Sequence, residues 1–191
     1  MSDFEAKQEK NIVGGDQAGR DINKNIYIVP NDGGRRTPMG NLIEKFRYEK
    51  KNDIQFKKTI EKLEHYSRRV EGDEIIGLEA KLKAAEYDAF IEFAQKTKEL
   101  FAKKLAKHQF SESAQQIYAF LLAEMWDRYY RNVYPQIQNG LPQDRICKLV
   151  ETQVLDPIKE LLEENVLELY ADEISGMLCF LTGNCHIKWT R

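Results

Sequence analysis

The spacing of hydrophobic residues differs between the start of this chain and the rest of it. After about residue 40, apolar side chains recur every three, four or seven positions, which is typical of amphipathic helices. The predicted helices cover residues 53–70, 76–108, 112–133 and 144–155, then a helix starting at Asp156-Pro157 and an apolar segment over 174–181. Residues 185–189 alternate, which predicts a short strand or an extended tail. The body is therefore predicted to be mainly α, a helical bundle.

Two of these helices are predicted to dominate the bundle. The helix over 76–108 should be its spine, with lysines on the outer side. Its predicted buried stripe consists of Leu78, Leu82, Phe90, Phe93, Ala94, Thr97, Phe101 and Leu105. The helix over 112–133 has Ser111 as a predicted N-cap and is expected to be ended by Pro135 and the turn Asn139-Gly140-Leu141-Pro142. Its apolar positions cover so much of the circumference that we expect packing on more than one side.

The first 29 residues follow another pattern. Three glycines fall within residues 14–19, and residues 22–28 then alternate as in a strand, which predicts a short glycine-rich β ribbon. A two-stranded ribbon is marginal alone in water, and its exposed edges favour pairing with other strands. We therefore predict a homo-oligomerisation element. Its predicted contact residues are Ile12, Val13, Gly14, Gly15, Asp16, Gly19, Arg20, Asp21, Ile22, Ile26 and Ile28.

Prolines and glycines separate this ribbon from the body. Residues 30–40 read PNDGGRRTPMG, a composition typical of a linker. The predicted organisation is a β assembly motif over residues 1–30, a linker over 31–40 and a helical partner-binding domain over 41–191. Whether the ribbon pairs within one chain or between chains is left open by the sequence.

Composition narrows the functional classes. Hydrophobic residues make up 42% of the 191 positions, enough for a core, and the net charge of −2 lacks the basic excess of a dedicated nucleic-acid binder. The N-terminal residues lack the apolar core of a secretory signal. The three cysteines, an odd number, suit a reducing compartment. We therefore predict a cytoplasmic protein without a membrane span.

Three candidate chemistries were weighed against structural explanations. Residues 14–21 have the glycine spacing of a phosphate-binding loop, but Arg20 and Asp21 stand where Lys and Ser or Thr are needed. Cys179, Cys185 and His186 lack the paired spacing and the fourth ligand of a zinc site. Cys185 and His186 are neighbours that would point to opposite faces of an extended segment. We predict no catalytic residue, no metal and no cofactor.

Two surface patterns have a structural and a functional explanation. Lysines at 96, 98, 103, 104 and 107 are interspersed with Glu92 and Glu99, which favours a solvated helix face over a docking surface for nucleic acid. Trp126, Tyr129, Tyr130 and Tyr134 are spaced as on one side of a helix, which favours core or interface packing over a base-stacking platform.

Two stretches resemble known families. Residues 14–22, GGDQAGRDI, resemble the GGDxxGRDI-type β motif of bacterial conflict proteins, which implies assembly through an incomplete β-solenoid-like element. Residues 98–105, 113–118 and above all 177–189, MLCFLTGNCHIKW, resemble the helical C-terminal domains of effectors in prokaryotic three-component ABC-ATPase systems, over roughly residues 55–189. That resemblance implies docking to an ABC ATPase and its accessory protein. Effectors of this kind carry a toxic domain ahead of the tail, and here about 40 residues without an acidic catalytic cluster stand there.

The sequence thus predicts a non-enzymatic adaptor of a bacterial defence system. It is expected to form a homo-oligomer through the ribbon and to bind a larger partner, such as an ABC-type ATPase. The predicted partner-binding residues are Thr182, Gly183, Asn184, Cys185, His186 and Trp189. The rivals are a small nuclease or hydrolase that uses Cys185 and His186, and a nucleic-acid sensor that uses the lysine face.

Overall fold

The computed structural model describes residues 37–191 of the chain. The predicted β ribbon, with its contact residues between Ile12 and Ile28, and most of the predicted linker lie outside the described residues. The described part is mainly helical and holds no β-strand. None of its helices combines the length and the apolar character that crossing a membrane requires.

The elements follow one another with short connections. In chain order they are α1 (Pro38–Lys51), α2 (Glu61–Ser67), α3 (Leu78–Ala84), the 3₁₀ turn η1 (Asp88–Phe90), α4 (Ile91–Lys107), α5 (Glu112–Arg128), the π-helical turn η2 (Tyr129–Val133), α6 (Tyr134–Gln138), α7 (Gln143–Val150), the π-helical turn η3 (Glu151–Leu155), α8 (Asp156–Leu161) and α9 (Ala171–Gly183).

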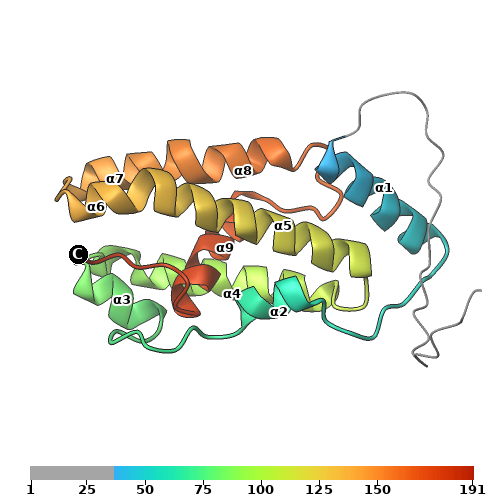
Figure 1. The fold of residues 1–191 in the computed structure, drawn as a ribbon, viewed down its shortest axis with the longest axis horizontal. Helices are drawn as coiled ribbons and strands as arrows, with labels where there is room; N and C mark the ends of the chain where they lie inside the picture. Colours follow the sequence, from blue (N-terminus) through green and yellow to red (C-terminus); the bar gives the residue numbers. More distant parts are fainter. Residues whose placement is uncertain (1–36) are drawn as a thin grey trace, which may run out of the picture.

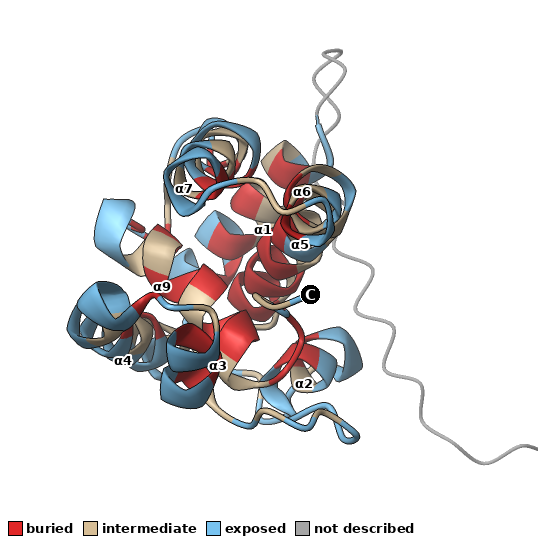
Figure 2. Ribbon diagram, turned by 90° about the vertical axis from the view of Figure 1, so that its left-hand side faces the viewer, coloured by how far each residue is buried: buried red, intermediate tan, exposed pale blue. Residues whose placement is uncertain are grey.

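The helices form two layers with α9 between them (Figure 1). One layer is a hairpin in which α7 and α8 run back along α5 and α6, with α1 near the end of α8. The other contains α2, α3 and α4. Helix α9 packs against α4, α3, α5 and α8 and so joins the layers. Buried residues face the centre of this arrangement from both sides (Figure 2).

The core confirms the expected role of the helix after Ser111. Ser111 Oγ accepts a hydrogen bond of 3.1 Å from Ala114 N, as its predicted N-cap role requires. Tyr118, Leu121, Leu122 and Met125 are fully buried, in agreement with packing on several sides. Glu49 of α1 is also buried, and its carboxylate accepts hydrogen bonds from the N-terminal turn of α5, including one of 2.6 Å from Ser113 Oγ.

Helices α4 and α9 approach each other most closely at Gly176. A methyl group built on Gly176 would stand 2.1 Å from the carbonyl oxygen of Thr97 and 2.9 Å from the Cβ of Phe101. Only a residue without a side chain allows this approach. Because Thr97 and Phe101 are both buried, the crossing belongs to the core of the molecule.

The predicted spine over 76–108 is wrong as a single helix. Gly77 precedes α3 with φ of 89°, and Glu86 adopts φ of 61° after α3 ends, so α4 begins only at Ile91. The break also changes which side chains are covered. Phe90 and Phe93, predicted to be buried, are 50% and 52% exposed, whereas Leu78, Leu82 and Ala94 of the same stripe are buried.

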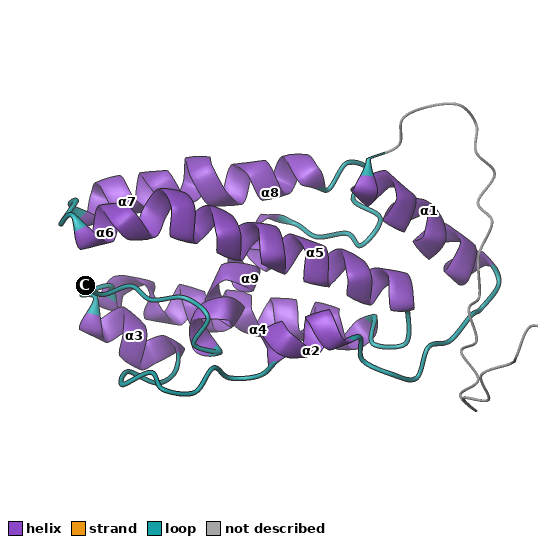
Figure 3. Ribbon diagram, viewed as in Figure 1, coloured by secondary structure: helices purple, strands orange, loops and turns teal. Residues whose placement is uncertain are grey.

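Two predicted helix ends are also wrong, because the chain stays helical through two prolines. Helix α5 continues through η2 into α6, although Pro135 was expected to stop it, and α7 continues through η3 into α8 (Figure 3). Asp156 is thus not an N-cap. Each proline is the second residue after a π turn, in which Tyr134 N–H donates to Tyr129 O and Asp156 N–H to Glu151 O. The wider turns rearrange the hydrogen bonds just where proline lacks a donor.

The start of the body differs in detail from the prediction. The helix expected over 53–70 is present only as α2, and the rest of that range is loop. Helix α1 begins at Pro38, inside the predicted linker, with Thr37 as its N-cap. Proline at the first helical position and the 2.9 Å hydrogen bond from Gly40 N to Thr37 Oγ1 explain this start. The apolar segment over 174–181 is helical, as expected, within α9.

Candidate docking surface at the C-terminal segment

The C-terminal segment, residues 184–191, leaves α9 through a Schellman turn. Asn184 is the C-cap, His186 N–H donates to Leu181 O at 2.9 Å, and Cys185 N–H donates to Thr182 O at 3.1 Å. Cys185 occupies the position after the cap with φ of 63°, where glycine is usual. The turn directs the following residues back across the body instead of away from it.

From this turn the segment runs extended along α5, η2 and α6, and no strand of residues 37–191 pairs with it. The indole N–H of Trp126 donates to His186 O at 3.1 Å, Tyr129 OH donates to Lys188 O at 2.8 Å, and the side-chain amide of Gln138 reaches Thr190 O at 3.3 Å. Alternate carbonyls of an extended chain point to the same side. Three side chains from the continuous helix formed by α5, η2 and α6 therefore satisfy the carbonyls of residues 186, 188 and 190.

The carbonyl of Ile187, which lies between the first two of these, is satisfied from the opposite layer. Lys81 of α3 is 4% exposed, and its ammonium donates to Ile187 O at 3.0 Å and forms an ion pair with Asp73. Asp73 also pairs with Lys188 at 3.5 Å. Burial disfavours the charged form of Asp73, but the hydrogen bond and charge of Lys81, helped by Lys188, outweigh it and hold the pKa of this carboxyl below its usual value.

The loop after α2 fixes the beginning of the segment. Val70 N–H donates to Asn184 O at 3.0 Å, and the Asn184 side chain donates to Tyr66 O at 3.1 Å. His186 Nε2 lies 3.0 Å from the carbonyl of Arg68, which assigns the proton to that nitrogen. Burial lowers the pKa of His186, so its neutral form is favoured further.

The predicted partner-binding residues therefore share a structural task. Thr182, Cys185 and His186 are buried, and Trp189 is half-buried with its indole N–H 3.1 Å from Thr182 Oγ1. Gly183 and Asn184 are also half-buried. Their role in binding stays a prediction, and their contacts hold the segment against the body.

Sequence reasoning missed Lys81 and Asp73, which complete the site. Lys81 carried a usable signal, since it lies three residues after Leu78 on the predicted buried stripe, where a lysine requires a charge partner. Asp73 lies in a loop, and no periodicity points to it.

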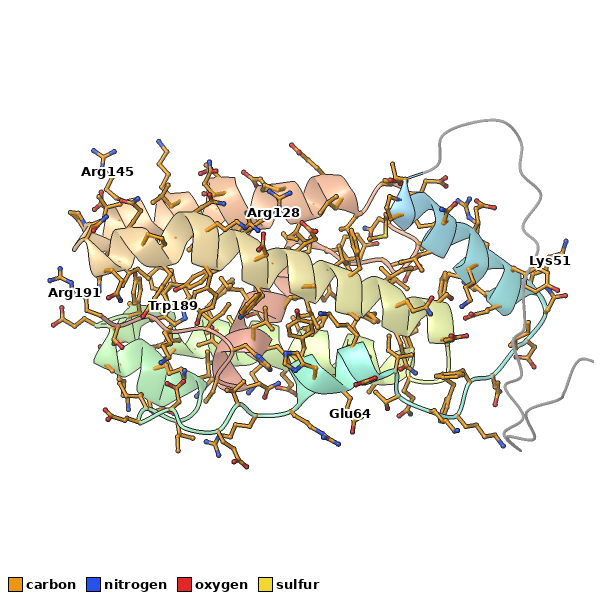
Figure 4. All side chains as sticks on the ribbon, viewed as in Figure 1. Lys51, Glu64, Arg128, Arg145, Trp189 and Arg191 are labelled. Carbon is orange, nitrogen blue, oxygen red and sulfur yellow. The ribbon has the colours of Figure 1, made fainter. Side chains whose placement is uncertain are left out.

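The surface beside the segment is aromatic and charged. A cleft of about 280 Å³ is lined by Asp73, Glu74, Lys81, Tyr134 and residues 188–191, among others. Next to it, ring centroids lie 5.3 Å apart for Trp126 and Tyr130 and 5.1 Å apart for Tyr130 and Tyr134. Trp126 is 40% exposed. Trp189 lies between the layer of α5–α6 and that of α3, and Arg191 lies at the outer end (Figure 4).

The structure shows the surroundings of the cysteines considered from the sequence. Within residues 37–191, no group of three or more His, Cys, Asp or Glu side chains is placed to hold a metal ion. Cys179 lies 3.7 Å from Thr97 Oγ1, and burial raises the pKa of its thiol to about 11. A thiol with so high a pKa is a poor nucleophile at neutral pH.

The fold and this segment define a helical domain that ends in an anchored, extended tail. Residues 77–189 match the family model of C-terminal domain 9 of the ABC-three component (ABC-3C) systems, and the chain belongs to that family. These systems are conflict systems. The match runs from the start of α3 to Trp189 and thus includes the anchored segment. Searches of characterised proteins and of solved structures found no match.

Proposed function

We propose that this chain is a non-enzymatic adaptor of a bacterial defence system. It assembles with copies of itself through residues 1–30 and docks a larger component, such as the ABC-type ATPase of its own system, through the face beside the C-terminal segment. Family membership supports a role inside a multi-component system. The observation that carries the docking face is the ladder of neighbouring rings that runs from exposed Trp126 through half-buried Tyr130 and Tyr134 next to the cleft.

Tryptophan, tyrosine and arginine are the residues that most often dominate binding energy at protein interfaces. On this face the aromatic ladder lies beside Lys188 and Arg191, and Asp73 and Glu74 line the same cleft, so the face carries charges of both signs. The partner-binding residues predicted from the sequence do not contact the partner themselves on this proposal, because they are largely buried and hold the extended segment in place. On this proposal Thr182, Cys185 and His186 shape the docking face, and the ladder contacts the partner.

The test is binding of the full chain to the ABC ATPase of the same system, measured by calorimetry or pull-down. We expect Trp126→Ala to weaken binding at least tenfold. Phe110→Ala is the matched control, because Phe110 is 53% exposed in the turn between α4 and α5, and it should bind as the wild type does. Trp126→Phe separates the ring from its hydrogen bond to His186 O and should retain most of the affinity. Wild-type affinity in Trp126→Ala would remove this face from the proposal.

The assembly part has its own test. Deleting residues 1–30 should lower the particle mass measured by light scattering, and an unchanged mass would exclude a hub in that stretch. The absence of enzymatic activity is tested by incubating the purified chain with DNA and RNA. Cleavage that is lost in both Cys185→Ala and His186→Ala would favour the nuclease rival instead.

A further inference from the structure

The outer side of α4 carries a short repeat that the core does not use. Phe93 and Leu100, seven residues apart, lie on the same side of the helix and are 52% and 40% exposed. Glu92 precedes the first and Glu99 the second, and Lys96 and Lys103 follow at the same spacing. Each Glu pairs with the Lys four residues later, at 2.5 Å and 2.6 Å between the charged atoms. Exposed apolar residues on a helix with flanking charges are typical of helix-pairing surfaces.

The charges of this repeat complement those of a second, antiparallel copy of the same helix. A two-fold axis that relates two antiparallel copies of a helix places the same flank of each helix on the same side of the contact. If the axis passes near Thr97 and Lys98, Glu92 faces Lys103 of the other copy and Lys96 faces its Glu99. Every acid then meets a base, and the two bases are kept apart from each other. The same placement leaves Phe93 two residues, about 3 Å along the helix axis, from Leu100 of the other copy, a separation that the phenylalanine side chain can span.

Phe93 also has room for that contact. It lines an apolar cleft of about 170 Å³ together with Phe90, Leu155 and Leu178, among others, between α4 and the π turn η3. An aliphatic side chain from another molecule can be received at its edge. The structure therefore offers apolar contact and charge complementarity on one helix face.

We propose that α4 is a self-association surface, on which a second copy of this chain pairs its α4 antiparallel about a two-fold axis. This interface lies apart from residues 1–30 and from the aromatic ladder of the proposed function. A single pair of helices of about 25 Å buries little area compared with a standard interface. The association is therefore weak and depends on protein concentration, and it adds pairwise links between chains.

Sedimentation of the full chain over a range of concentrations tests the pairing. The double variant Phe93→Glu/Leu100→Glu should lose the concentration-dependent twofold increase in particle mass that the wild type shows. Phe110→Glu, an equally exposed phenylalanine off α4, should keep it. A wild type without such a step, or a double variant that keeps it, would overturn the proposal.

A charge reversal gives a sharper answer. The variant Lys96→Glu/Lys103→Glu and the variant Glu92→Lys/Glu99→Lys should each fail to pair alone, because like charges then face each other. An equimolar mixture should recover the twofold mass step, since each Glu again meets a Lys. Recovery cannot come from a general loss of helix stability, and far-UV circular dichroism checks that both variants are folded. A mixture that stays unpaired contradicts the antiparallel arrangement. Failure here would leave binding to the ATPase and the hub deletion unaffected.

Discussion

Helix α9 and the C-terminal segment follow each other in the chain and are largely buried, yet different interactions hold them. Helix α9 satisfies its own backbone, and its position is decided by shape, above all by the contact of Gly176 with the carbonyl of Thr97. The extended segment has no partner strand within the described part of the chain. Its carbonyls are satisfied by the side chains of Trp126, Tyr129 and Lys81, among others.

The difference follows from the backbone. Buried carbonyl groups need hydrogen-bond donors, and a helix supplies them internally while an isolated extended strand does not. We therefore expect α9 to be sensitive to side-chain volume and the segment to be sensitive to the loss of single donors. Substitutions that change either a side-chain volume or a single hydrogen-bond donor test this difference.

The largest effect is expected at the helix crossing. Gly176→Ala should destabilise the protein by about 3 kcal/mol, because the new methyl group would overlap a backbone oxygen and α4 and α9 would have to separate. Gly183→Ala in the same helix is the control. There the methyl group meets only the flexible end of Lys98, so the gain in helix propensity should leave stability unchanged or improve it by up to about 1 kcal/mol. Urea denaturation measures both, and equal losses would show that shape does not single out Gly176.

The second-largest loss of stability is expected at Lys81 of α3, which donates a hydrogen bond to the C-terminal segment. Lys81→Ala should cost about 3 kcal/mol, because it leaves the carbonyl of Ile187 without its donor and removes the main partner of half-buried Asp73. Lys83→Ala, on the same helix but exposed and paired with Glu79, should leave stability essentially unchanged. Hydrogen exchange should show the amides of residues 186–190 losing protection in the first variant and not in the second.

Part of this fold could be predicted from local features of the sequence. The helical class, the N-cap at Ser111 and the broad burial of α5 followed from periodicity and capping, which are local properties. The break at Glu86, where φ is 61°, did not, because no glycine or proline within α3 or just after it signals the change. Proline was misleading in the opposite sense, since π turns carry the helices through Pro135 and Pro157.

The sequence located the candidate site as a segment but did not show which residues hold that segment in place. The residues from Thr182 to Trp189 stood out by resemblance, but their burial could not be read from an alternating pattern. Lys81 and Asp73 are separated from the segment by more than 100 residues of sequence. Contacts of this kind become visible only when the layers are placed together.

Acid pH should weaken the anchoring of the segment through Asp73. Because the folded-state pKa of this carboxyl lies below the unfolded value of about 3.9, its contribution to stability is present above that value. It is lost as the pH falls through the lowered folded-state pKa. The difference in unfolding free energy between the wild type and Asp73→Asn should therefore be largest at neutral pH and shrink below about pH 4. A difference that stays constant from pH 7 to pH 3 would show that Asp73 acts by packing and not by charge.

The smallest effect is expected where the two regions join. Cys185 has a side chain at φ of 63°, a conformation that costs non-glycine residues about 1 kcal/mol, and the same side chain is buried. Cys185→Gly relieves the backbone and loses the buried thiol, so the two terms nearly cancel. Cys185→Ala loses most of the thiol contact and keeps the unfavourable φ. The glycine variant should therefore be more stable than the alanine variant by about 1 kcal/mol in urea denaturation. If alanine were the more stable, packing of this residue and not the geometry of the turn would decide how α9 passes into the C-terminal segment.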